Sequence, residues 1–247
     1  KDLTIPQQKA YSQIKEGFKD KKVCLFHGVT SSGKTEVYIK LIEEQLVKGR
    51  QVLYLLPEIA LTTQIINRLR KHFGNKVGVT HSHLNNSERV EVWKAVQEKD
   101  KKKAQYPIML GARSALFLPF DNLGLIVVDE EHDGSYKQSE APRYQARDMA
   151  VVRSAQEGAL CVLGSATPAL ESWHNAQRGR FRLLTLPDRV GGGKLPPVKV
   201  IDLREARKKK KEKSDARSEA GLVLTAPLVE AVHDRLRRGE QTILLLN

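Results

Sequence analysis

Short apolar runs alternate along most of this chain with longer segments whose apolar positions recur at helical spacing. The short runs predict strands at residues 22–28, 51–56, 76–81, 107–112, 123–129 and 159–164. The helical patterns lie between them and predict helices at residues 6–18, 34–48, 60–72, 87–99, 144–156 and 169–178. Strands that alternate with helices favour right-handed crossovers and parallel pairing. We therefore predict a three-layer α/β fold with a mainly parallel central sheet and helices on both faces.

The pattern changes from about Phe181 onward, where the strand candidates become short and isolated. We predict strands at residues 181–186 and 198–203, a helix at residues 226–238 and a final strand after that helix. Such elements are typical of a peripheral tail or of a linker that leads to a further domain.

Domain boundaries follow from this change. We expect a main domain at residues 1–186, a Pro/Gly- and Lys-rich linker or peripheral segment at residues 187–225, and a closing helix and strand at residues 226–247. The chain begins without Met and ends at Asn247, where an apolar strand has barely finished. We therefore expect a piece of a longer protein, with more sheet after Asn247.

Composition indicates a soluble protein with a polyanionic partner. The 247 residues are 40% apolar and 29% charged, and no run approaches the roughly 18 apolar residues of a membrane span, so we expect no membrane partner. The net charge is +13. Residues 207–213 carry six positive charges and one negative, so the rest of the chain keeps a net charge of +8. DNA, RNA and an anionic surface all fit such a charge.

The two cysteines, Cys24 and Cys161, each lie inside an apolar run. Neither has a Cys or His neighbour at the spacing of metal ligands, so we expect buried thiols and no zinc site in this chain.

A complete G-x-x-x-x-G-K-[ST] string lies between the first predicted strand and the next helix. Backbone N–H groups of such a loop, with a helix N-terminus behind them, cradle a phosphate chain. The residues expected to bind the phosphates of ATP are Gly28, Val29, Thr30, Ser31, Ser32, Gly33, Lys34 and Thr35. Lys34 is expected to reach the β- and γ-phosphates, and the Thr35 hydroxyl is expected to bind Mg²⁺. The string also occurs by chance, but its strand–loop–helix context favours a nucleotide site.

A second motif follows the apolar run at residues 123–128, which ends in Asp129-Glu130-Glu131-His132. A continuous apolar run is typical of a strand buried on both faces, and its C-terminal end opens onto the ligand crevice of a parallel sheet. We expect Asp129 to hold the Mg²⁺ together with Thr35, and Glu130 to orient and deprotonate the attacking water. Acidic residues after a strand are otherwise solvated turn residues. The two motifs together predict a nucleoside triphosphatase.

Three further segments follow predicted strands: Pro57-Glu58-Ile59-Ala60-Leu61-Thr62, Gly111-Ala112-Arg113-Ser114-Ala115-Leu116-Phe117 and Gly164-Ser165-Ala166-Thr167-Pro168. With the two motifs above, they resemble the first motor lobe of superfamily 2 helicases, a RecA-like P-loop NTPase domain. The strings at residues 28–38, 113–117 and 129–138 resemble the bacterial replication-restart helicases in particular. This resemblance covers nearly the whole chain and is weakest at residues 187–222.

The resemblance implies an ATP-driven 3′-to-5′ DNA helicase that acts in primosome assembly and in the restart of stalled replication forks. The implied partners are branched forks, single-stranded DNA, primosome proteins and single-strand-binding proteins, in the bacterial cytoplasm at the nucleoid. A second motor lobe with an arginine finger, and a zinc module, are implied outside this chain. On its own, the chain is expected to hydrolyse ATP slowly or not at all.

The resemblance also implies roles for single residues. Gln7 corresponds to a glutamine that reads the adenine edge, although Gln8 leaves this register open by one residue. The residues implied in coupling nucleotide state to DNA are His132, Ser165 and Thr167. The residues implied in DNA binding are Thr62, Arg113, Tyr136, Lys137, Arg143 and Tyr144.

Physical reasons support these DNA contacts, and structural alternatives stay open. Tyr136 and Tyr144 offer ring faces for base stacking, and Lys137 and Arg143 can reach phosphates. The tyrosines can instead pack the loop onto the domain, and Arg113 can instead form a structural salt bridge.

Two other functions compete with a helicase. One is a basic nucleic-acid-binding module whose phosphate loop is structural and supports no turnover. The other is a small-molecule kinase, which would need an acceptor pocket and a lid that the sequence does not indicate.

Overall fold

The computed structural model describes residues 3–20, 22–61, 63–82, 84–98, 106–189, 197–204 and 224–245. The chain divides into two compact units, at residues 1–194 and 195–247. No helix within the described ranges is long and apolar enough to cross a membrane.

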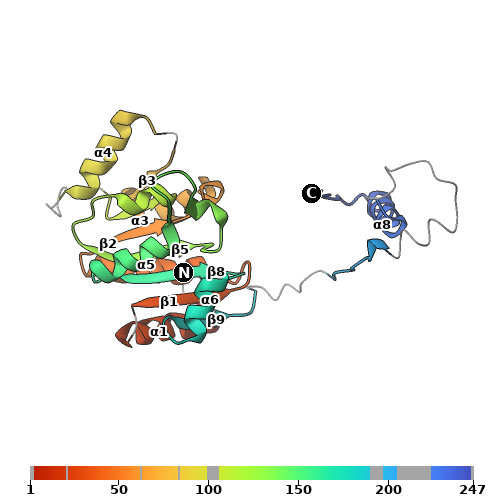
Figure 1. The fold of residues 1–247 in the computed structure, drawn as a ribbon, viewed down its shortest axis with the longest axis horizontal. Coiled ribbons are helices and arrows are strands. Elements are labelled where there is room, and N and C mark those ends of the chain that lie inside the picture. The colour runs from red at the N-terminus through yellow and green to blue at the C-terminus, as the bar shows by residue number, and fades with distance from the viewer. Residues whose placement is uncertain are drawn as a thin grey trace. The chain divides into compact units, whose positions relative to one another are not determined.

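One seven-stranded sheet organises the first unit (Figure 1). Its strands, in spatial order, are β3 (Val77–Thr80), β4 (Ile108–Gly111), β2 (Gln51–Leu55), β5 (Leu123–Asp129), β8 (Leu160–Ser165), β1 (Val23–Gly28) and β9 (Arg182–Leu186). Every neighbouring pair is parallel. The predicted parallel sheet is therefore confirmed, and all its strands end at the same edge.

Helices cover both faces of this sheet, as the sequence predicts. One face packs against α1 (Ile5–Asp20), α2 (Lys34–Val47) and α3 (Thr63–Phe73). The other packs against α4 (Asn86–Gln97), α5 (Ala146–Gln156) and α6 (Leu170–Gln177). Each central strand supplies both cores because successive side chains point to opposite faces: Val52 and Tyr54 of β2 enter the first core, and Leu53 and Leu55 the second.

Short elements connect these layers. Among the described residues, the 3₁₀ turns η1 (Glu58–Ala60), η3 (Arg113–Phe117) and η4 (Gly134–Tyr136) follow the ends of strands, whereas η2 (Gly74–Lys76) directly precedes β3. A two-stranded antiparallel hairpin pairs β6 (Lys137–Gln138) with β7 (Tyr144–Gln145). In the second unit, α8 (Ala226–Arg237) confirms the predicted helix at residues 226–238.

Several predictions for the later part of the chain were wrong. The strand predicted at residues 181–186 is present as β9, and it pairs with β1 at the edge of the main sheet. It thus belongs with the main domain predicted at residues 1–186, and only its interpretation as part of a peripheral tail was wrong. Residues 198–202 and 241–245 form no strand, and neither segment belongs to a described sheet. An isolated apolar run without a hydrogen-bonded neighbour leaves its backbone groups to water, so apolar character alone does not produce a strand there.

The helix limits also shift at two places. The helix predicted from residue 60 begins at Thr63 because residues 58–60 form η1 and Leu61 has the non-helical angles φ −76° and ψ 60°. The helix predicted from Tyr144 begins at Ala146, because Tyr144 and Gln145 pair with β6. Cys24 and Cys161 are free and buried, as predicted, and burial raises the pKa of the Cys161 thiol to about 12.

Candidate active site

The strand ends bring the two nucleotide motifs to neighbouring positions. β8 lies between β5 and β1 in the sheet, and Asp129 at the end of β5 pairs in register with Gly164 of β8. His27, next to the end of β1, pairs with Ser165. The phosphate loop, Asp129 and Ser165 therefore all lie at one edge of the sheet because the strands are parallel.

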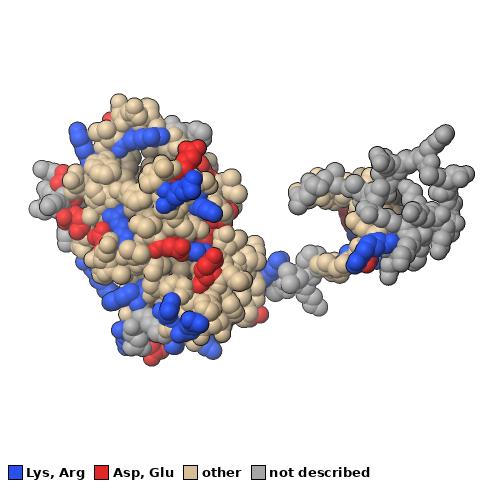
Figure 2. Space-filling view, in the orientation of Figure 1, with Lys and Arg blue, Asp and Glu red and all other residues tan. Residues whose placement is uncertain are grey.

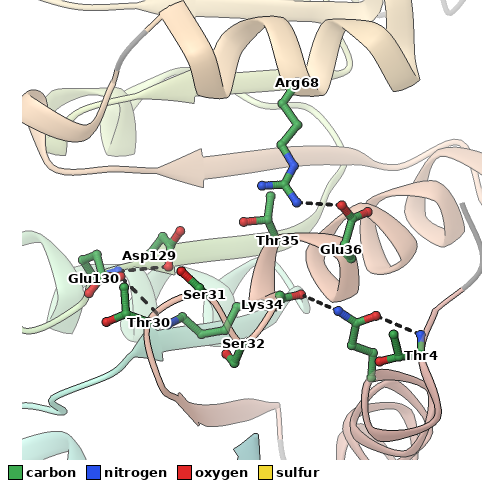
Figure 3. Close-up of a pocket in the computed structure, with 12 residues that line it drawn as sticks. Thr4, Thr30, Ser31, Ser32, Lys34, Thr35, Glu36, Arg68, Asp129 and Glu130 are labelled. Atoms are coloured by element: carbon green, nitrogen blue, oxygen red, sulfur yellow. Dashed lines mark hydrogen bonds and ion pairs between the residues drawn. The ribbon is translucent and has the colours of Figure 1, made fainter. Parts of the chain in front are cut away.

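A pocket of about 620 Å³ opens at this edge (Figure 3). The residues that line it are Thr4, Gln7, Thr30, Ser31, Ser32, Gly33, Lys34, Thr35, Glu36, Arg68, Asp129 and Glu130. The Lys34 Nζ lies 4.0 Å from the Glu130 Oε1. Residues from the two predicted motifs thus line one cavity.

Backbone geometry shapes the loop before α2. Gly33, the N-cap residue of α2, has φ 87° and ψ 27°, a left-handed conformation that glycine adopts without steric cost. At Gly28, an added Cβ would lie 2.9 Å from the Ser32 Oγ and 3.1 Å from the Lys34 Cγ. The two glycines therefore let the loop curl tightly over the N-terminus of α2, where unpaired N–H groups favour an anion.

The side chains of the loop fit a phosphate chain. Lys34 is buried, and its Nζ donates a hydrogen bond to the Gly28 carbonyl oxygen at 2.7 Å. The Ser32 Oγ is buried and has no hydrogen-bond partner among the described residues. A buried hydroxyl without a partner is costly, so the loop is complementary to a ligand that carries hydrogen-bonding oxygens.

Asp129 lies among hydroxyl donors at the inner wall of the pocket. Its Oδ1 accepts hydrogen bonds from the Tyr38 hydroxyl at 3.3 Å and from the Glu130 N–H at 3.1 Å, and its Oδ2 accepts one from the Tyr54 hydroxyl at 3.0 Å. Burial, and then the Glu130 carboxylate, raise the pKa of Asp129 to about 6, while Lys34 opposes this rise. Burial and the nearby Asp129 also raise the pKa values of both tyrosines, so they remain donors.

A divalent cation suits this carboxylate. Two hydroxyl donors hold Asp129 in one orientation, and a cation would offset the cost of its buried charge. Thr35, whose hydroxyl is the other predicted ligand, lines the same pocket. Carboxylate and hydroxyl oxygens are hard ligands of the kind that Mg²⁺ accepts. The residues present therefore fit the predicted metal.

Glu130 has an unusual backbone conformation, with φ 47°. Left-handed angles at a residue other than glycine cost free energy and often occur at functional sites. Two basic side chains lie near its carboxylate. The Lys34 Nζ is 4.0 Å from the Oε1, and the His132 Nδ1 is 3.7 Å from the Oε2. The strained turn thus directs Glu130 toward the pocket, immediately after β5 ends.

The three residues predicted to couple nucleotide and DNA lie in contact with one another. The His132 Nδ1 is 2.7 Å from the Ser165 Oγ, and the Thr167 N–H donates to the same Oγ at 2.9 Å. Ser165 is buried, whereas Thr167 is exposed. His132 therefore links the end of β5 to the segment that follows β8.

Gln7, rather than Gln8, lines the pocket. The Gln7 Oε1 accepts the Thr4 N–H at 2.9 Å, and its Nε2 donates to the Gly33 carbonyl oxygen at 3.4 Å. Gln8 is exposed and does not line the pocket. Of the two glutamines that the sequence left open, Gln7 is therefore the one next to the phosphate loop, and its contact with adenine stays a prediction.

Sequence reasoning missed several pocket residues. Arg68 of α3 forms an ion pair with Glu36 of α2, with 2.6 Å between the Nη2 and the Oε1. Glu36 directly follows Thr35, so its position could have been inferred, whereas Arg68 reaches the pocket only through the packing of α3. Tyr38 and Tyr54 do not line the pocket but hold Asp129 from behind it. They were missed because buried aromatic residues usually belong to the core.

The predicted DNA-binding residues cluster less tightly. Arg113 and Tyr144 line a second pocket, of about 420 Å³, with Glu58, Ser82, Ala112, Ser114, Phe117, Ser135, Gln138 and Pro142. Lys137 and Arg143 are exposed on the hairpin and its loop. Thr62 lies outside the described residues.

The prediction that Tyr136 offers a ring face for base stacking was wrong. Its side chain is fully buried in the second core, and its hydroxyl donates to the Asp129 carbonyl oxygen at 2.6 Å. A buried ring has no free face for a base, so Tyr136 anchors the loop instead.

Arg113 does not form the structural salt bridge that was the alternative to DNA binding. Its Nη1 instead donates to the carbonyl oxygens of Ser135 and Lys137, at 2.9 and 3.0 Å. Tyr144 stacks edge-to-face on Phe117 and remains partly exposed.

Comparisons with known proteins agree with this geometry. Residues 4–176 match the DEAD/DEAH box helicase family. The chain is 41% identical to replication restart protein PriA of Bacillus subtilis, across 99% of this chain and 29% of the relative, and 43% identical to PriA of Rickettsia felis, across 100% and 35%. The chain thus spans about a third of the length of these curated relatives.

Solved structures share the fold. RecG bound to a three-way DNA junction superimposes with a TM-score of 0.56 at 21% identity, over 79% of this chain and 25% of that one. The Hef helicase domain of Pyrococcus furiosus superimposes with a TM-score of 0.53 at 18% identity, over 96% of this chain and 53% of that one. The predicted RecA-like architecture is confirmed.

Proposed function

Since this chain belongs to the DEAD/DEAH box helicase family, we propose that it is the first, ATP-binding motor lobe of a DNA helicase that restarts stalled replication forks. The observation that carries the proposal is the single pocket lined by Lys34, Asp129 and Glu130. A cation, a metal-binding carboxylate and a second carboxylate in one cavity are what hydrolysis of a triphosphate requires.

The roles follow from the positions of the side chains. When ATP binds, the Lys34 Nζ leaves the Gly28 carbonyl oxygen and binds the β- and γ-phosphate oxygens. The N–H groups of residues 29–35 and the Ser32 hydroxyl bind the remaining phosphate oxygens. Gln7 is next to the loop and contacts the adenine edge. Thr35 and Asp129 hold Mg²⁺, which supplies charge stabilisation on the phosphate oxygens when it is bound.

Glu130 orients the attacking water and accepts its proton. Its strained turn directs the carboxylate into the pocket, where the Glu130 Oε1 lies 4.0 Å from the Lys34 Nζ. The contacts among His132, Ser165 and Thr167 connect this base to the segment after β8. Completion of the site requires an arginine finger from a second motor lobe, so this lobe alone hydrolyses ATP slowly.

DNA contacts the exposed loops at the same sheet edge. Lys137, Arg143 and the partly exposed ring of Tyr144 offer phosphate contacts and a stacking face, and Arg113 holds the hairpin in place. On the face of the first unit drawn in Figure 2, basic side chains are scattered among acidic ones and form no broad basic stripe.

Wider features of the proposal rest on the similarity to replication restart proteins. We assign to the whole protein 3′-to-5′ translocation, binding of forks and single-stranded DNA, and contacts with primosome and single-strand-binding proteins at the nucleoid. Residues 1–186 form the nucleotide-binding lobe, residues 187–225 a linker or peripheral segment, and residues 226–247 lead into the second lobe.

The test is the Glu130→Gln substitution in the complete protein. Loss of the base lowers DNA-stimulated phosphate release by roughly 10²–10⁴-fold, while a fluorescent ATP analogue binds with unchanged affinity. Glu43→Gln is the control, since Glu43 lies outside the pocket and pairs with Lys40. Unchanged turnover in Glu130→Gln would refute the assigned role. Absence of any turnover in the wild-type protein would favour a binding module, and phosphorylation of a small acceptor would favour a kinase.

A further inference from the structure

Glu131 is the one acidic residue of the strand-end motif that the proposed mechanism leaves without a role. Its side chain is fully buried and makes three contacts. The Oε1 accepts the Ala169 N–H at 2.8 Å, the Oε2 accepts the Ser172 hydroxyl at 2.8 Å, and the Arg147 Nη1 is 3.5 Å from the Oε2. A buried carboxylate with this many donors is a fixed structural joint, because losing a partner would leave the charge uncompensated.

This joint connects three elements. Glu131 is the second residue after the end of β5 at Asp129, and its own N–H donates to the Gly164 carbonyl oxygen of β8 at 3.0 Å. Ala169 is the N-cap residue of α6, where a carboxylate is favourable because the first N–H groups of a helix are unpaired. Arg147 belongs to the first turn of α5 and also pairs with Asp148 and Glu171. The end of β5 is thereby tied to the starts of both α5 and α6.

Residues 130–132 face three different neighbours. Glu130 lines the nucleotide pocket, Glu131 binds the start of α6, and His132 contacts Ser165. A shift of α6 would therefore act, through the contacts of Ala169 and Ser172 with the Glu131 carboxylate, on the peptide groups on either side of Glu131. Those peptide groups belong to the proposed base and to the proposed coupling histidine.

The loop at residues 133–145 begins and ends at the same joint. It leaves the chain directly after His132 and enters α5 one residue before Ala146, so Arg147 lies at its far end. Within the loop, Tyr136 is tied to the Asp129 carbonyl oxygen, and Arg113 holds the carbonyl oxygens of Ser135 and Lys137. A ligand that moves this loop therefore pulls on both sides of Glu131.

We propose that the buried Glu131–Arg147 pair is a positioning device that transmits DNA binding at the loop of residues 133–145 to the catalytic base Glu130. The inference rests on the proposed function, since it assumes that the loop binds DNA and that Glu130 acts on water. Glu131 and Arg147 line neither of the two pockets described above, and their effect passes through the peptide of Glu130 and the start of α5.

The test compares Glu131→Gln and Arg147→Met in the complete protein. Glutamine retains the size of the side chain and one carbonyl acceptor but removes the charge that Arg147 neutralises. Three quantities are measured for each variant: phosphate release with and without saturating single-stranded DNA, affinity for a fluorescent ATP analogue, and the midpoint of thermal unfolding. Arg147→Lys, which retains the charge, gives a second variant in case Arg147→Met does not fold.

Arg153→Met is the matched control. Arg153 also belongs to α5 and is largely buried, but it binds the Leu116 and Leu118 carbonyl oxygens and Glu157, away from the end of β5. Its loss is expected to lower the unfolding midpoint without changing how strongly DNA stimulates hydrolysis.

The expected result is a selective loss of stimulation. The ratio of DNA-stimulated to DNA-free hydrolysis falls on the order of tenfold in Glu131→Gln and Arg147→Met, within the usual range of coupling between sites, and partly recovers in Arg147→Lys. The DNA-free rate and the nucleotide affinity stay at wild-type values. An unchanged ratio, an equal loss of both rates, or an equal fall of the ratio in Arg153→Met would each overturn the proposal. A wild-type protein that DNA does not stimulate would instead refute the proposed function itself.

Discussion

Asp129 illustrates how the site places a charge in a largely desolvated position at the wall of the pocket. Tyr38 and Tyr54 donate to its two oxygens, yet burial and Glu130 still raise its pKa to about 6 from an ordinary 3.8. Hydroxyl donors orient the carboxylate but do not compensate for its desolvation. The carboxylate is therefore poised for a cation, which removes that cost when it binds.

This raised pKa makes the stability of the metal-free chain depend on pH. The folded state binds the Asp129 proton more tightly than the unfolded state does. The contribution of this proton to the free energy of unfolding is therefore fully present below about pH 4 and is lost as the pH rises through about 6. The Asp129→Asn substitution removes this pH-dependent loss of stability. At pH 7.5 with a chelator present, the variant should be more stable than the wild type by on the order of 2–3 kcal/mol, measured by urea unfolding.

Glu43→Gln, which removes a carboxylate on the surface of α2, should leave that pH dependence in place. If Asp129→Asn and the wild-type chain lose stability in parallel between about pH 4 and 7, then Asp129 is not the source of the effect.

The sequence predicted the roles of residues that belong to chemical motifs, but not the roles of residues that are placed by packing. Lys34, Asp129 and Glu130 belong to strings whose order already implies their chemistry, and the pocket contains all three. Glu131 was within such a string but had no predicted role, because its partners Ala169 and Arg147 come from other elements. Tyr136 was misjudged because an aromatic residue in a polar loop has the same appearance whether it is exposed or buried.

At the scale of elements, helix α2 and strand β8 meet at one tight contact. A Cβ added at Gly164 would lie 1.8 Å from the Tyr38 hydroxyl and 3.2 Å from the Asp129 Oδ1. Tyr38 is fully buried and cannot move aside easily. Glycine at position 164 leaves room for the Tyr38 hydroxyl to lie against β8 and to reach Asp129.

Gly164→Ala should therefore destabilise the chain by about 1–3 kcal/mol, because the added methyl group overpacks this contact. Combined with Tyr38→Phe, which removes the clashing hydroxyl, it should cost less than the sum of the two single substitutions in a double-mutant cycle of unfolding free energies. Gly134→Ala is the control, since a Cβ there meets nothing within 4 Å. Additive costs for Gly164→Ala and Tyr38→Phe would show that the hydroxyl is not the obstacle.

The central strands were predictable because they are buried on both faces. β5, for example, is a continuous apolar run whose alternate residues enter the two cores, and its limits match the prediction at residues 123–129. The role of β9 was not predictable, since pairing beside β1 depends on where the chain returns after α6. The segments at residues 198–202 and 241–245 are apolar enough for strands but belong to no described sheet.

At the scale of the whole molecule, parallel pairing explains why distant motifs act together. Because β1, β5 and β8 all run in the same direction, the phosphate loop, the acidic residues and the segment after Gly164 lie at one edge. The loop of residues 133–145 begins at that edge too. Nucleotide chemistry and the proposed DNA contact are therefore neighbours by topology, and a buried pair such as Glu131 and Arg147 can join them.

The most direct measurement is a crystal structure of the protein with Mg²⁺ and a non-hydrolysable ATP analogue. We predict that the triphosphate lies in the loop of residues 28–35, that the Lys34 Nζ leaves the Gly28 carbonyl oxygen for the β- and γ-phosphates, and that the metal lies between Thr35 and Asp129. An analogue bound elsewhere, or a metal without Asp129 beside it, would contradict the account.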